Sequence, residues 1–92
     1  MEYKVKQSNK FIKDIKNCKR RGYNIELLST VINDYLKRDI PLPNNYVDHS
    51  LKGIYHNKRD CHIAPDWILI YEIDKENSIL YLVRTGTHSD LF

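Results

Sequence analysis

The sequence is short of cysteine, of long apolar runs and of any targeting signal. Its two cysteines, Cys18 and Cys61, do not form a C-x-x-C pair, so a disulfide framework is not expected. No apolar run approaches the roughly 20 residues that a membrane-spanning helix needs, and no signal peptide is recognisable. We therefore expect a protein of a reducing compartment, the cytoplasm, with no membrane partner.

The length and composition predict one folded domain over residues 1–92. Apolar residues make up 41% of the chain, which is enough for a small core and argues against wholesale disorder. A domain this small buries only about two-thirds of its unfolded surface. A tightly bound partner could therefore supply much of its working stability by mass action.

Positive charge is concentrated at the N-terminus. The net charge is only +3, yet the first 21 residues contain two acidic side chains, Glu2 and Asp14, against a crowd of basic ones. These are Lys4, Lys6, Lys10, Lys13, Lys16, Lys19, Arg20 and Arg21. Such a run is usually the solvated face of a helix. The alternative is an electrostatic footprint on a polyanion such as RNA, whose binding would depend on salt.

Periodicity predicts a strand and then two helices in the first 40 residues. Polar and apolar side chains alternate over residues 2–6, as expected for a short strand. Ser8 can cap a helix that Gly22 ends, and Asn24 can cap a second helix. Apolar side chains recur at helical spacing in both segments. They are Phe11, Ile12, Ile15 and Cys18 in the first, and Leu27, Leu28, Val31, Ile32, Tyr35 and Leu36 in the second.

The pattern changes to strands after a loop over residues 39–50. Residues 52–55 and 59–63 are short strand candidates, and residues 67–73 are apolar on both faces, as expected for a central strand. A turn at 74–77 and a return strand at 78–84 would complete a hairpin. We therefore predict an α+β fold in which two antiparallel N-terminal helices pack on a mainly antiparallel, curved sheet.

The last nine residues combine three kinds of side chain that an RNA-cleaving site uses. Arg84 is a permanent cation that can hold a phosphate, and the imidazole of His88 can exchange a proton near neutral pH. Phe92 has an aromatic ring that can stack on a base. The structural alternative is a C-terminal strand followed by a frayed tail.

Strand alternation predicts where the other candidate groups lie. In the segment 59–63, Cys61 and Ile63 should face the core, and Asp60 and His62 should share the opposite, open face. The turn that contains Asp66 follows directly. The hairpin then returns the chain, so the sheet could gather His62, Asp66, Arg84 and His88 in one cleft. Spacing alone does not show how the loop residue His49 would join them.

These groups suffice for RNA cleavage by internal transesterification, which requires no metal. His62 or Asp66 could take the proton from the 2′-OH, Arg84 could steady the transition state, and His88 could protonate the leaving 5′-oxygen. Some of the candidate residues also have ordinary structural explanations. His62 could pair with Asp60 on a solvated strand, Asp66 could simply belong to a turn, and Trp67 could pack in the core. A zinc set of Cys61, His62, His49 and His88 matches no common ligand spacing.

Three ordered motifs resemble one known family. They are residues 48–53 (DHSLKG), residues 59–71 (RDCHIAPDWILIY) and residues 84–92 (RTGTHSDLF). In these segments the chain resembles the YafQ branch of the RelE/ParE toxins, and its N-terminal half agrees in length and helical pattern. Members of this family are toxins of bacterial type II toxin–antitoxin systems and act as mRNA interferases.

The resemblance implies a ribosome-dependent endoribonuclease that cuts mRNA in the ribosomal A site, with no cofactor. The products would be a 2′,3′-cyclic phosphate and a 5′-OH, and translation would be inhibited. His88 would be the principal general acid. Asp66, with His49 or His62, would serve as base or orienting group.

Four further residues match functional positions of the family. Arg84 would stabilise the transition state, and Phe92 would help to hold the mRNA. Asp60 and Trp67 match motif positions in supporting, substrate-binding roles. The family fold, two helices on a mainly antiparallel sheet, agrees with the pattern described above.

The resemblance also implies partners. An acidic antitoxin with a helix that wraps the toxin should neutralise it, and operator DNA would be bound only through that complex. The 70S ribosome and mRNA would be the targets, with the basic first helix facing ribosomal RNA. Two other functions remain open: a non-enzymatic toxin of the same fold, such as a gyrase inhibitor, and a plain RNA- or protein-binding module.

Overall fold

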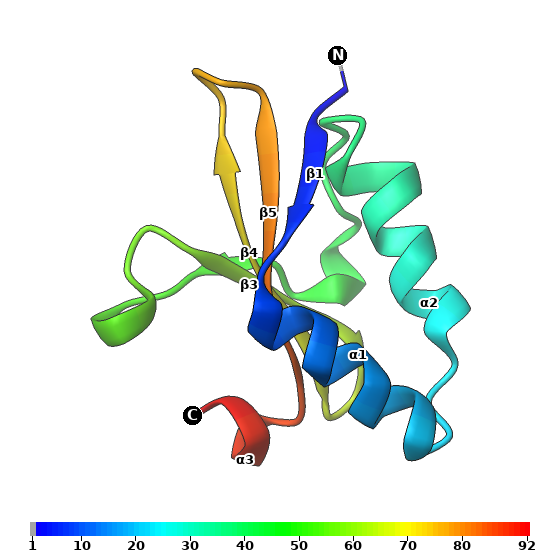
Figure 1. Cartoon of the computed structure of the whole chain (residues 1–92). Coiled ribbons are helices and arrows are strands. Elements are labelled where there is room, and N and C mark those ends of the chain that lie inside the picture. The colour runs from blue at the N-terminus through cyan, green and yellow to red at the C-terminus, as the bar shows by residue number, and fades with distance from the viewer. Residues whose placement is uncertain (1) are drawn as a thin grey trace.

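A five-stranded sheet organises the computed structural model of the protein, which describes residues 2–92 (Figure 1). The strands are β1 (Lys4–Gln7), β2 (His49–Ser50), β3 (Arg59–Ala64), β4 (Trp67–Asp74) and β5 (Ile79–Gly86). Their order across the sheet is β1-β5-β4-β3-β2. β1 runs parallel to β5, and the other neighbouring pairs are antiparallel. The α+β class predicted from the sequence is confirmed.

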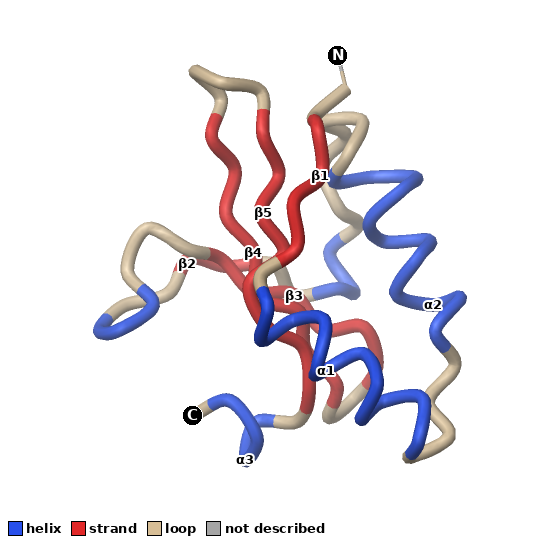
Figure 2. The backbone as a smooth tube through the Cα atoms, in the orientation of Figure 1, coloured by secondary structure: helices blue, strands red, loops and turns tan. Residues whose placement is uncertain are grey.

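β4 is the central strand, as its apolar sequence predicted. Its residues from Trp67 to Tyr71 are all buried, because an apolar cluster covers each face of the strand. The larger cluster includes the N-terminal helices. The smaller cluster, on the opposite face, packs Leu91 of the C-terminal segment against Ile68 and Ile70. Figure 2 shows β4 and β5 as the two long strands of a hairpin.

Two N-terminal helical segments begin where the sequence predicted. α1 (Asn9–Arg20) starts at Ser8, whose hydroxyl accepts a hydrogen bond from the Phe11 N–H and donates one to the Val83 carbonyl of β5. α2 (Ile25–Thr30) starts at Asn24 and continues through the wider turns of a π-helix, η1 (Val31–Leu36). The two segments diverge from the turn at Gly22 (Figure 1), so side-by-side antiparallel packing describes them only loosely.

The segment between the helices and β3 differs from the prediction. Residues 52–55, expected to be a strand, contain a 3₁₀ turn, η3 (Gly53–Tyr55), because Gly53 adopts a left-handed φ of 72° that breaks strand geometry. The predicted loop instead contains a 3₁₀ turn, η2 (Asn44–Tyr46), and the two-residue strand β2. β2 pairs with β3 and covers its edge.

The C-terminal residues form a helix rather than a frayed tail. α3 (His88–Leu91) is one turn long and begins with a capping box, in which Thr87 and Asp90 satisfy each other's backbone N–H groups. Leu91 is 5% exposed and anchors the helix against the sheet. Over the described residues, 2–92, no helix has the length and apolar character needed to cross a membrane.

A matched pair of leucines on α2 tests its packing. Leu28 is 2% exposed in the core, whereas its neighbour Leu27 is 46% exposed. Leu28→Ala should lower the free energy of unfolding by about 2–5 kcal/mol, because the removed side chain leaves a cavity. Leu27→Ala should change it by less than about 0.5 kcal/mol. Urea denaturation followed by circular dichroism measures both, and equal losses would contradict this orientation of α2.

Candidate active site

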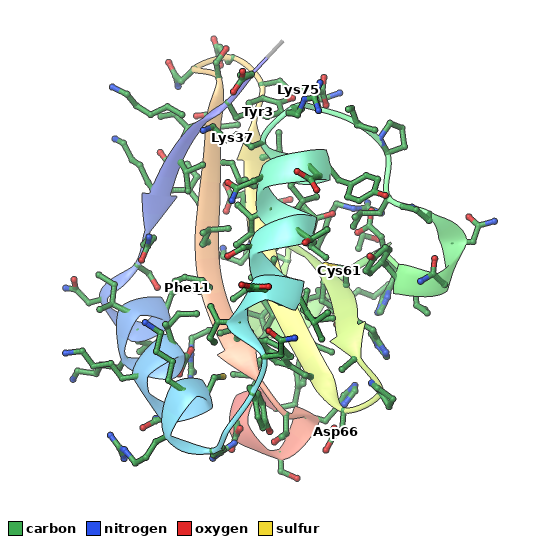
Figure 3. The ribbon with its side chains drawn as sticks, turned by 90° about the vertical axis from the view of Figure 1, so that its right-hand side faces the viewer. Tyr3, Phe11, Lys37, Cys61, Asp66 and Lys75 are labelled. Carbon is green, nitrogen blue, oxygen red and sulfur yellow. The ribbon has the colours of Figure 1, made fainter. Side chains whose placement is uncertain are left out.

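Asp66 and His88 meet at the end of the sheet where β4 begins and β5 ends. Asp66 lies in the turn between β3 and β4, beside α3 (Figure 3). Its Oδ1 lies 3.2 Å from His88 Nδ1 and 3.4 Å from the His88 backbone N. These hydrogen bonds, chiefly the one from the imidazole, lower the pKa of the Asp66 carboxyl. An ionised carboxylate only accepts, so Nδ1 carries the proton and Nε2 is left for other contacts.

His62 lies beside His88, as strand alternation predicted. The two ring centroids are 5.6 Å apart, with the planes at 72°. His62 sits on β3 next to an irregularity in the register with β4, between His62 and Ala64. A hollow of about 310 Å³ opens beside His62. It is lined by Asn45, Tyr46, His62, Ile63, Ala64 and Pro65.

His49 reaches the site through β2, which spacing could not show. It pairs with Asp60 across β2 and β3, and its Nδ1 lies 3.0 Å from Asp60 Oδ1. Asp60 is only 2% exposed, so the prediction that it lies on an open face beside substrate is wrong. The reason is that β2 and its histidine cover that part of β3. Burial raises the pKa of the Asp60 carboxyl, and nearby His49, His62 and His88 partly offset that rise.

Phe92 is held at the edge of the site with its ring accessible. It is 62% exposed, and its ring centroid is 6.1 Å from that of His88. Tyr55 of η3 supports it from the other side, with ring centroids 5.5 Å apart in an edge-on arrangement. The Tyr55 hydroxyl also donates a 3.1 Å hydrogen bond to the Leu91 carbonyl. No signal in the sequence marked Tyr55 as part of the site, because its segment was expected to be a strand and no pattern linked it to the C-terminus.

Arg84 is bound by an acidic residue of α1. Its Nε and Nη2 donate hydrogen bonds of 2.7 and 3.1 Å to the two carboxylate oxygens of Asp14. Asp14 Oδ2 also accepts the Thr85 backbone N–H at 3.1 Å. These bonds to Asp14 raise the pKa of Arg84, against the opposing effect of burial. Part of the guanidinium is therefore already engaged, and only the remaining N–H groups are left for a phosphate.

Trp67 lies in the core. It is 4% exposed, its Nε1 donates a 2.8 Å hydrogen bond to Thr85 Oγ1, and its ring packs against that of Tyr23. A ring buried in this way cannot stack on an incoming base. Its position supports the structural explanation rather than the substrate-binding role.

A second ion pair fixes α3. Arg21, at the C-terminal end of α1, donates hydrogen bonds of 2.7 and 3.2 Å to the two oxygens of Asp90. Gly86 leaves room for Asp90 at the entrance to α3, because a Cβ there would lie 2.9 Å from Asp90 Oδ2 and the carboxylate would have to shift. The helix that carries His88 is thus held by its cap, by Arg21 and by the buried Leu91.

The zinc set weighed from the sequence, Cys61 with three histidines, has one member that faces away from the others. Cys61 is fully buried on the core side of β3, where burial raises the pKa of its thiol. Among residues 2–92, no group of three or more His, Cys, Asp or Glu side chains is placed to hold a metal ion.

Residues 3–92 match the family model described as the bacterial toxin of type II toxin–antitoxin systems, YafQ. The chain belongs to the YafQ toxin family. It is 36% identical over 88 residues to the mRNA interferase toxin YafQ of Escherichia coli K12, covering 96% of this chain and 94% of that protein. Among solved structures, it is similar to the toxin in the E. coli DinJ–YafQ complex, with 35% identity and a TM-score of 0.88 over 100% of this chain and 99% of that one.

A metal-bound toxin from Helicobacter pylori is also similar, with 41% identity and a TM-score of 0.90 over the full length of both chains. Similarity of this extent covers the sheet, the helices and the C-terminal segment that carries His88. The five-stranded arrangement described above is therefore the fold of YafQ toxins.

Asp14→Ala tests the ion pair that holds Arg84. The change leaves the guanidinium and the Thr85 N–H without their acceptor, so the free energy of unfolding should fall by roughly 2–3 kcal/mol. That is less than the roughly 3–5 kcal/mol typical of a fully buried pair, since the Arg84 side chain is 22% exposed. Asp34→Ala, at an exposed position of η1, is the control and should change stability by less than about 0.5 kcal/mol. Equal urea midpoints for both variants would refute the pairing.

Asp90 should make stability depend on pH. The hydrogen bonds from Arg21 hold the pKa of Asp90 well below its usual range. In the unfolded chain an Asp carboxyl has a pKa of about 3.9. Just below that pH the unfolded chain therefore binds more protons at Asp90 than the folded chain does. Its contribution is complete above that value and is lost as the pH falls through the lower folded-state pKa. Asp90→Asn should therefore lower the melting temperature at pH 7, and its difference from wild type should shrink between about pH 4 and pH 2. A difference that stays constant over this range would contradict the ion pair.

Proposed function

We propose that this chain is a ribosome-dependent endoribonuclease that cleaves mRNA in the A site and so inhibits translation. The observation that carries the proposal is the arrangement around His88, whose Nδ1 is fixed by Asp66 beside His62 and Phe92. The name of the E. coli relative, an mRNA interferase toxin, supports the same activity.

The groups divide naturally into base, acid and charge stabiliser. His49 or His62 takes the proton from the 2′-OH, which then attacks the adjacent phosphorus. His88 acts as an imidazolium: Asp66 holds Nδ1–H while Nε2 gives its proton to the leaving 5′-oxygen, and the products are a 2′,3′-cyclic phosphate and a 5′-OH. Positioned acid–base groups of this kind contribute about 10²–10⁴-fold each, and the scheme uses no metal. The N–H groups of Arg84 that Asp14 leaves unengaged steady the phosphorane-like transition state.

The openness of the site supports a requirement for the ribosome. The side chain of His88 is 51% exposed and that of Asp66 is 70% exposed, so water surrounds the proposed acid. Catalytic electrostatics are much weaker in water than in a closed site. The ribosome would supply the missing walls and would align the mRNA against Phe92. The exposed basic side chains of α1 suit a contact with ribosomal RNA.

The partners proposed for the chain follow from the same family. The E. coli toxin is solved in complex with the antitoxin DinJ, and we infer an acidic antitoxin for this chain as well. Operator DNA would be contacted through that complex. A target on translating ribosomes places the protein in the cytoplasm.

His88→Ala on programmed 70S ribosomes is the direct test. Mapping of 5′ ends should show A-site cuts by the wild type that slow by about 10²–10⁴-fold in the variant, because the acid is removed. His56→Ala is the matched control, since His56 is an exposed histidine on the loop that follows η3, and it should cut like the wild type. A naked-RNA arm should cut poorly. A chelator of transition metals that leaves Mg²⁺ in place should have no effect.

Equal cutting by wild type and His88→Ala would remove His88 from the mechanism. No cutting by a folded wild-type protein would favour the non-enzymatic alternative, and gyrase supercoiling would then be the next assay. Loss of cutting in the presence of the chelator would refute the metal-independent scheme.

A further inference from the structure

Asp60 is a buried carboxylate that no part of the proposed mechanism yet uses. It is 2% exposed, and its Oδ1 makes no hydrogen bond to any residue of the described chain, 2–92. A buried polar atom without a partner is costly and uncommon in native structures. Nδ1 of His49 lies 3.0 Å from this oxygen.

Two oxygen atoms lie 3.0 Å from Nδ1 of His49, one from Asp60 and one from Val47. The Val47 carbonyl oxygen also lies 3.0 Å from Nδ1, and the ring plane is aligned for a hydrogen bond to that carbonyl rather than to Asp60. Val47 adopts a left-handed φ of 50°, a strained conformation for a β-branched residue. Both oxygens therefore favour the tautomer with the proton on Nδ1, which leaves Nε2 of this 51% exposed side chain without a proton.

We propose that Asp60 is the positioning residue and counter-ion of His49 in RNA cleavage. The inference rests on the proposed function. When Nε2 takes the 2′-OH proton, the ring becomes an imidazolium, and the Asp60 charge 3.0 Å from Nδ1 stabilises it. The proton stays on Nε2 and Asp60 remains ionised. Asp60 acts through His49 and does not touch the RNA, which agrees with its burial.

The other charged groups near Asp60 do not replace it. His62 and His88 lie close enough to favour its ionised form, while Asp48 opposes that form. The charge of Asp48 is already engaged, because Oδ1 accepts hydrogen bonds from Tyr71 at 2.6 Å and from Arg59 at 3.2 Å. Asp60 is thus the carboxylate that faces the His49 ring without a hydrogen-bonded partner of its own in the described structure.

A double-mutant cycle on the intact protein tests the role of Asp60. Asp60→Asn keeps the shape and removes the charge, so A-site cleavage should fall about 10–100-fold, the range seen when a metal-bound histidine loses the carboxylate that orients it. Ribosome affinity should not change. The acid limb of the pH–rate profile should move to lower pH, because a less stabilised imidazolium loses its proton more readily. In the His49→Gln background, Asp60→Asn should change the rate by less than about twofold, because the group through which it acts is gone.

A second measurement is independent of activity. His56 provides an internal control in the wild type, because its Nδ1 also contacts a local carbonyl, that of Gly53 at 3.2 Å, but no carboxylate is paired with it in the described residues. NMR of the ring nitrogens should show that Asp60→Asn changes the Nδ1 chemical shift of His49 and leaves that of His56 unchanged. An unchanged Nδ1 shift of His49 in the folded variant would overturn the proposal.

The outcomes separate the two hypotheses. A wild type that does not cleave RNA refutes the proposed function, and the NMR comparison then still decides whether Asp60 acts on His49. If the wild type cleaves, the proposal is overturned by an unchanged rate in Asp60→Asn. It is also overturned by an unshifted acid limb, or by an equal loss in the His49→Gln background.

Discussion

The burial of β4 is the constraint on which the rest of the structure depends. Five consecutive apolar residues, Trp67 to Tyr71, leave the strand no solvent-facing side, so it must lie inside the sheet with β3 and β5 on either side. The register then pairs Ile68 with Gly86. Asp66 lies two residues before one partner and His88 two residues after the other. Pairing of the central hairpin is therefore enough to bring this carboxylate and imidazole together at one end of the sheet.

The sequence was sufficient to predict those parts of the molecule that have a clear apolar periodicity or a helix-capping residue. These are both N-terminal helical segments, the β4–β5 hairpin and the meeting of His62, Asp66 and His88. It was insufficient where a short element decides the outcome. β2 has only two residues, too few to produce a pattern, yet it buries Asp60 and brings His49 into the site. Alternation showed which residues share a face of β3, but it could not show what covers that face.

Long-range charge pairing was also beyond the reach of the sequence. Asp14 lies in a run of lysines, so it was expected to belong to the same solvated helix face. In the structure its side chain turns inward and binds Arg84, 70 residues later in the chain. Composition records how many charges a segment has but not which of them face the core. Tyr55 was missed for a similar reason, since its contacts with Leu91 and Phe92 join segments that share no pattern.

The two ion pairs of α1 explain how so exposed a site keeps its shape. Asp14 and Arg21 are seven residues apart, so they lie on the same face of the helix. They bind Arg84 and Asp90, which lie at the start and near the end of the segment that carries His88. Each segment carries one acidic and one basic residue of these pairs. If the C-terminal segment docked in the reverse direction, like charges would face each other. Each pair alone contributes modestly where it meets water. Together they fix the direction in which the C-terminal segment lies along α1, and they leave the exposed lysines of that helix available to a polyanionic partner.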